Sequence, residues 1–228
     1  MTDDLDTSVH HQLVSGLLSA GKVPSNSALA ERMAVSVEVI ENALRRLADN
    51  HGLVLHPHVC EPWVIHPFSV SPSATWVEAG DRGWWAPCMW CACGIATLAG
   101  GEATIHTRIG GERENIDIHV AGGDVVEKDL WVHFATPPRA AWDNVHHFCA
   151  NVLSFHHPDD VRAWSERHGI SQGVVIPISQ VMDLGKAWYG RHADQEWHKW
   201  SVREASTIFT KVGLVGEFWE LPVSEGGF

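Results

Sequence analysis

Three of the five cysteines in this chain, Cys88, Cys91 and Cys93, lie within six residues of one another. The other two, Cys60 and Cys149, are far from this cluster in sequence. A thiolate is both a nucleophile and a preferred ligand of soft metal ions, so thiols at this density indicate thiol or metal chemistry. Which chemistry applies depends on the other residues that converge on the cluster.

The Cys88-x-x-Cys91 pair has four interpretations. The first is a zinc half-site completed by Cys93, Cys149 or a histidine, although the chain lacks the second C-x-x-C of a zinc ribbon. The second is a redox pair, for which the strand–motif–helix context of thioredoxin-like proteins is missing. The third is a thiolate trap for mercury or monovalent copper. The fourth is a set of buried, inert thiols, which three cysteines in six residues make the weakest choice.

Histidines are numerous, but their spacing does not favour a metal site of their own. We interpret His146 and His147, just before Cys149, as one core and one surface residue, because neighbouring strand residues face opposite sides. No histidine pair has the i, i+4 spacing of a metalloprotease helix. We expect His192 and His198 at the surface.

Two segments of the chain resemble the motifs of the organomercurial (alkylmercury) lyase family. That family has a Cys-x-x-Asp motif in a Trp-rich approach to an apolar helix, and a Phe-Cys motif in a strand followed by a helix with a Trp and an apolar strand. The matching segments here are Trp85-Ala-Pro-Cys-Met-Trp-Cys-Ala-Cys-Gly-Ile95 and Phe148-Cys-Ala150, the latter followed by Trp164 and residues 173–176. The resemblance spans nearly the whole chain and is weaker after about Tyr189.

The resemblance implies that Cys88 and Cys149 attack and hold mercury. Cys91 stands where the family has the Asp that handles the proton delivered to the departing carbon. An alternative register, with Cys93 as nucleophile and Ala96 at the acid position, loses two motif matches. A free thiol has a pKa near ~8.5 against ~4 for a carboxyl group. Cys91 therefore either relays a proton released on metal binding or completes a three-thiolate cage.

These considerations favour a lyase-like enzyme in which Cys88, Cys91 and Cys149 are both the catalytic and the metal-binding residues. The alternative is a non-catalytic or repurposed relative that binds a soft metal, mercury or copper, or an organic ligand through the same three cysteines. We expect no organic cofactor. The expected partners are a small organometallic or organic substrate, and small thiols that release the product. Cys93 would project from another face of a helix than Cys88 and Cys91, so we expect it in the core.

The N-terminal 60 residues have the pattern of a winged-helix-like module. Apolar spacing predicts helices over residues 4–20, 27–33 and 36–47 and a strand over 52–56. The third helix begins with Glu38 and Glu41, whereas a helix that reads a DNA groove carries basic or amide side chains there. We therefore expect this module to serve packing rather than DNA binding.

Residues 61–228 are predicted to form a mixed, antiparallel-sheet core with flanking helices and a C-terminal helical tail, so the fold class is α+β. The expected helices cover residues 92–98, 158–167, 178–189 and 192–214. The expected strands cover residues 103–109, 115–119 and 130–134, which form a meander by their glycine turns, and residues 152–155 and 173–177.

Composition narrows the partners and the compartment. The 228 residues carry a formal charge of −12, which repels a phosphate backbone, so we expect no nucleic-acid partner. No apolar run approaches the length of a membrane span, so we expect no membrane partner. The N-terminus lacks the features of a signal peptide, which favours reduced cysteines and the cytoplasm. A homodimer is compatible with this composition.

Overall fold

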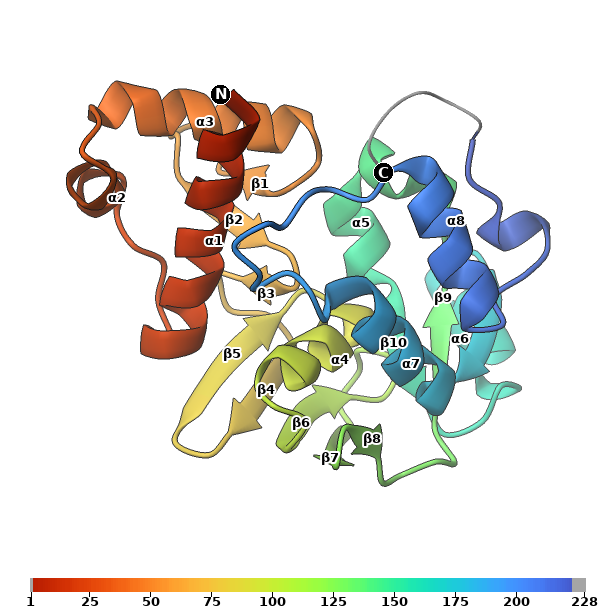
Figure 1. Ribbon diagram of the computed structural model, residues 1–228. Coiled ribbons are helices and arrows are strands. Elements are labelled where there is room, and N and C mark those ends of the chain that lie inside the picture. Colours follow the sequence, from red (N-terminus) through yellow and green to blue (C-terminus); the bar gives the residue numbers. More distant parts are fainter. Residues whose placement is uncertain (1, 223–228) are drawn as a thin grey trace.

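Three helices open the described part of the chain, residues 2–222 of a computed structural model (Figure 1). They are α1 (Thr2–Ala20), α2 (Asn26–Met33) and α3 (Val37–Asp49). Ser36 caps α3 by accepting a hydrogen bond from the backbone N–H of Val39, and the apolar stripe of α3 is buried. The predicted helices are thus confirmed, while their grouping into a winged-helix-like module over residues 1–60 stays a prediction.

An antiparallel sheet lies next to these helices (Figure 1). Its strand order is β1-β2-β3-β5-β4-β6-β7-β8. The strands are β1 (Val54–Leu55), β2 (Pro62–Ile65), β3 (Phe68–Ser69), β4 (Thr75–Ala79), β5 (Arg82–Ala86), β6 (Ala103–Arg108), β7 (Asn115–Ala121) and β8 (Asp124–Val125). Gly122 and Gly123 both have positive φ, which lets the chain turn tightly between β7 and β8. The fold is α+β, as predicted.

A second, three-stranded antiparallel sheet has the order β10-β9-β11. Its strands are β9 (Trp131–Phe134), β10 (Val152–Phe155) and β11 (Val174–Pro177). The prediction that residues 130–134 continue the meander of β6 and β7 is wrong. The short β8 occupies the position beside β7, and β9 pairs on both edges with strands from later in the chain.

Helix α4 (Met89–Leu98) crosses between the large sheet and α7 (Ile178–Tyr189) at the centre of the molecule (Figure 1). Its first eight residues are all buried, as the apolar sequence predicts for residues 92–98. The remaining helices are α5 (Val145–Ala150), α6 (Asp160–His168) and α8 (Val202–Lys211), with short 3-10 turns η1 (Pro138–Asp143) and η2 (Glu217–Trp219). None of the helices described is both long and apolar enough to cross a membrane.

The C-terminal tail is less helical than predicted. Residues 192–214 were expected to form one helix, but α8 begins only at Val202. Ser201 and Glu204 form a capping box there, in which each side chain accepts a hydrogen bond from the other's backbone N–H. Residues 190–201 form an irregular segment instead, which we call the tail loop.

Candidate active site

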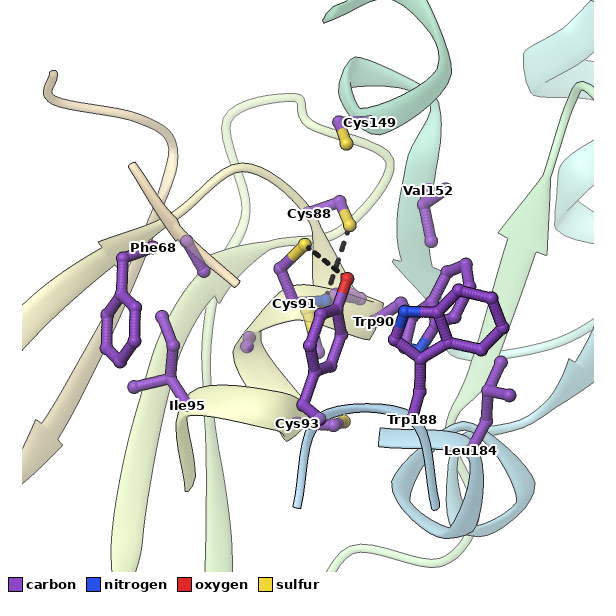
Figure 2. Packing of buried hydrophobic residues seen from close by; sticks show 14 of the residues in the cluster. Phe68, Cys88, Trp90, Cys91, Cys93, Ile95, Cys149, Val152, Leu184 and Trp188 are labelled. Atoms are coloured by element: carbon purple, nitrogen blue, oxygen red, sulfur yellow. Dashed lines mark hydrogen bonds between the residues drawn. The ribbon is translucent and has the colours of Figure 1, made fainter. Parts of the chain in front are cut away.

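Cys88 lies at the junction between β5 and α4 and is the N-cap residue of the helix. Its Sγ accepts a hydrogen bond of 3.4 Å from the backbone N–H of Cys91 (Figure 2). Burial alone would raise the pKa of the Cys88 thiol. Hydrogen bonds from the Cys149 and Cys91 side chains and from the backbone N–H groups of Cys91 and Trp90 outweigh it, and hold this pKa well below its usual range. A helix N-terminus favours negative charge, so Cys88 is the thiolate of the site.

Cys91 lies one helical turn after Cys88 and is fully buried. Its Sγ is 3.4 Å from the hydroxyl oxygen of Tyr189 at the end of α7, and 3.7 Å from Nδ1 of His66, which follows β2. Burial raises the pKa of the Cys91 thiol well above its usual value, and the neighbouring Cys88 thiolate raises it further. Cys91 is therefore a protonated thiol beside a thiolate.

Cys149 comes from a different part of the chain and faces the other two thiols (Figure 2). It was expected in a strand, but it lies in α5, whose first turn is capped by the Asn144 side chain. Hydrogen bonds with Cys88 and Cys91, together with burial, raise the pKa of the Cys149 thiol well above its usual value. The helix brings its buried sulfur to the start of α4. His146 and His147 are both exposed on this helix, so the prediction that one of them lies in the core is wrong.

The three cysteines proposed from the sequence thus converge, and a histidine joins them. Ligand atoms of His66, Cys91 and Cys149 all lie within 4.8 Å of one another. Cys88 is not part of this group of ligand atoms; its Sγ accepts a hydrogen bond of 3.4 Å from the backbone N–H of Cys91, next to the group. Thiolate and imidazole donors suit a soft metal ion rather than a hard one such as magnesium.

Two residues of the site were missed from the sequence. Tyr189 is the single tyrosine of the chain, and this rarity is the one sequence signal that marks it. Burial raises the pKa of Tyr189 well above its usual value, so its hydroxyl stays protonated beside Cys91. His66 carries no local signal, and burial lowers its pKa to about 3, so it is a neutral imidazole.

The remaining cysteines lie apart from the three thiols. Cys93 is buried against Gly185 of α7, and burial raises the pKa of its thiol to about 12. In Figure 2 it lies on the far side of α4 from Cys149. Cys60 is half-buried, and its thiol donates to the backbone oxygen of Glu41. Neither thiol is placed to join the site.

A cavity of about 50 Å³ opens onto the thiols. Its walls are largely aromatic, with Trp90, Trp142, Trp188 and Trp197 among them. The tail loop closes one side with His192, Trp197 and Lys199. His192 is buried, so the prediction that it lies at the surface is wrong; its ring stands 4.9 Å from that of Tyr189, centroid to centroid.

Comparison with known proteins agrees with this geometry. The model of the MerB family, alkylmercury lyase, matches residues 68–190, which contain all three converging cysteines. Among solved structures, the mercury-bound form of MerB2 is similar with a TM-score of 0.63 and 16% sequence identity, covering 84% of this chain and 94% of that one. At that identity the likeness shows the fold alone. No curated protein matches the chain significantly.

Proposed function

Because this chain belongs to the alkylmercury lyase family, we propose that it cleaves the carbon–mercury bond of small organomercurials by protonolysis. The observation that carries the proposal is the convergence of Cys88, Cys91 and Cys149 at the N-terminus of α4. These thiols line a small cavity together with several aromatic side chains.

In this proposal Cys88 and Cys149 are the mercury ligands. The Cys88 thiolate attacks first and displaces the halide or small thiolate that the mercury carries, because it is the one thiol of the three whose pKa is lowered. Cys149 then binds the same mercury. Because a soft metal strongly acidifies a coordinating thiol, the Cys149 proton passes to the departing carbon, directly or through Cys91. Two thiolates raise the electron density on mercury and weaken its bond to carbon.

Cys91 takes the place of a carboxylic acid as proton relay. When the carbon–mercury bond breaks, its electron pair stays on carbon, which takes the proton of the Cys91 thiol or the one released by Cys149. The products are the hydrocarbon and a mercuric ion held by thiolates. The hydroxyl oxygen of Tyr189 lies 3.4 Å from the Sγ of Cys91. When Cys91 has given up its proton, the Tyr189 hydroxyl donates a hydrogen bond to the thiolate and stabilises it. Small thiols then remove the mercuric ion, which fits a reducing compartment such as the cytoplasm.

Hydrocarbon release tests the proposal. The purified protein, given an alkyl or aryl mercurial and excess small thiol, is expected to release the hydrocarbon, measured by gas chromatography of the headspace. Cys88→Ser and Cys149→Ser should abolish release. Cys91→Ser should lower kcat by about 10²–10⁴-fold, the usual cost of losing a positioned proton donor. Cys60→Ser, which changes a thiol remote from the site, is the matched control. No release by the wild type, with Cys91→Asp also inactive, would end the proposal.

A second candidate is sequestration of mercury, with copper as the other soft ion to test. It is favoured by the 4.8 Å grouping of His66, Cys91 and Cys149, which offers more donors than a turnover site needs. It predicts tight, stoichiometric metal binding without hydrocarbon release, measured by titration calorimetry against a competing thiol. Unchanged affinity in Cys91→Ser would rule out the three-thiolate version.

A further inference from the structure

The active-site cavity has no carboxylate in its described lining, although the protein as a whole is acidic. The chain carries a net charge of −12, yet no Asp, Glu or Arg is among the described residues that line the cavity. Its negative group is the Cys88 thiolate, and Lys199, from the tail loop, is the one lysine in this lining.

Lys199 is held in place without a counter-ion. Its Nζ donates a hydrogen bond of 2.9 Å to the backbone oxygen of His51, and lies 4.7 Å from the ring centre of Trp142. Among the described side chains, those of residues 4–222, no carboxylate forms an ion pair with it. Burial lowers the pKa of Lys199 to about 7, so the amine readily takes up a proton when a negative group arrives. An ammonium has three N–H donors, and only the one to His51 is used.

Two histidine rings that line the cavity also have a ring nitrogen without a hydrogen-bond partner among the described residues. His192 is 5% exposed, and its Nδ1 is buried without a hydrogen-bond partner. Nε2 of His66 is likewise buried and unpartnered. Each imidazole ring carries at least one N–H, which can donate to a ligand in the cavity. Buried polar atoms are rarely left unpaired in proteins, and these two line a cavity.

We propose that the cavity is specific for small organomercurials whose organic group carries a carboxylate. The mercury binds at Cys88 and Cys149, and the carboxylate pairs with Lys199, with the ring nitrogens of His66 and His192 as further donors. The inference rests on the proposed function, since it names the substrate class of the same site.

The size of the cavity limits the organic group. A cavity of about 50 Å³ is a few times the roughly 10–15 Å³ that a single water needs, so it admits an organic group of only a few non-hydrogen atoms. A carboxymethyl group has four, and it places a negative charge a short distance from mercury. The walls are rich in aromatic rings, and in such a low-dielectric space an ion pair to Lys199 is stronger than in water.

The residue that selects the substrate in this proposal lies outside the segment that the family model matches. The family model matches residues 68–190, and Lys199 and His192 both follow it. In this proposal the tail loop determines which substrate binds, and the three cysteines carry out the reaction.

Paired substrates of equal size test the inference. Carboxymethylmercury and its amide, carbamoylmethylmercury, differ in charge but hardly in shape. The wild type is expected to prefer the carboxylate by about tenfold or more in kcat/KM, as a charge-assisted hydrogen bond supplies. Lys199→Met should remove this preference by raising KM for the carboxylate alone, and Lys199→Arg should keep most of it. Lys211→Met, at an exposed position of α8, is the matched control.

A binding measurement separates failure of this inference from failure of the proposed function. Titration calorimetry with both mercurials, on the wild type and on Cys91→Ser, reports affinity whether or not hydrocarbon is released. Equal affinity for the two mercurials, or a carboxylate preference that survives Lys199→Met, would overturn the inference even if the lyase reaction occurs. The thiol that releases the product can be varied in the same way, with 3-mercaptopropionate compared with its amide. If Lys199→Met changes only this second comparison, the lysine binds the carboxylate of the thiol, and the substrate assignment is overturned.

Discussion

At the scale of single residues, identical side chains acquire different acidities from their positions. Cys88, Cys91 and Cys149 are all buried. Only Cys88 stands at a helix N-terminus where backbone N–H groups point at its sulfur, and its pKa falls while those of the other two rise. The site therefore has one thiolate, Cys88, and two protonated thiols, Cys91 and Cys149. The proposed reaction needs a thiolate to bind mercury and a proton for the departing carbon.

Thiol alkylation checks this assignment. Because its pKa is lowered, Cys88 keeps its thiolate to a lower pH than an ordinary thiol with a pKa near ~8.5. Iodoacetamide should label Cys88 before Cys91 and Cys149, at a rate that falls less on going from about pH 9 to 7 than the rate of a free thiol. Cys93, whose pKa is raised to about 12, should stay unlabelled. Peptide mass spectrometry gives the site and rate. First labelling of Cys91 or Cys149 would contradict the assignment.

At the scale of elements, two glycines let α4 and α7 cross closely enough for Tyr189 to reach Cys91. A Cβ added to Gly94 would lie 2.2 Å from Cδ2 of the Tyr189 ring, and one added to Gly185 would lie 2.8 Å from Cβ of Cys93. Real carbon atoms do not approach so closely, so larger residues would push the helices apart. The glycines thereby position a proton donor from α7 at the thiols of α4.

The Gly94→Ala variant tests this crossing. We expect it to lower the free energy of unfolding by about 1–3 kcal/mol, the usual cost of overpacking a core, although alanine alone favours helices. It should also displace Tyr189 and lower kcat for hydrocarbon release. Chemical denaturation measures the first effect, and Tyr189→Phe is the control for the second, since it removes the hydroxyl and keeps the ring. Wild-type stability with unchanged kcat would refute the crossing argument.

At the scale of the whole molecule, the N-terminal helices share one hydrophobic core with the catalytic region. Buried side chains of α1, the large sheet, α4 and α7 form a continuous cluster. The indole N–H of Trp84 on β5 donates a hydrogen bond of 2.7 Å to the backbone oxygen of Leu17 on α1. Two turns earlier on α1, His10 stacks on Trp197 of the tail loop with ring centres 3.5 Å apart. Helix α1 therefore supports both the sheet and the loop that closes the cavity.

Paired tryptophan substitutions measure the support from α1. Trp84→Phe removes the indole hydrogen bond to the Leu17 carbonyl, which keeps only the helical bond from the Gly21 N–H. The lost hydrogen bond costs about 0.5–1.5 kcal/mol, besides the lost ring volume. Trp85→Phe is the control, because Trp85 is only half-buried in the same strand. Urea denaturation should show the larger loss for Trp84→Phe. Equal losses in the two variants would show that the link to α1 contributes nothing of its own.

The sequence by itself determined the family, the α+β class and most helices, because caps, glycine turns and apolar spacing act over a few residues. It also placed Cys88 and Cys91 on one face, since i, i+3 positions share a side of a helix. It could not place β9, the helix that carries Cys149, or the tail loop, because contacts between distant segments decide them. Only the tertiary structure brought His66, Tyr189 and Lys199 to the thiols and set which sulfur is charged, since burial and approaching dipoles depend on every element around the site.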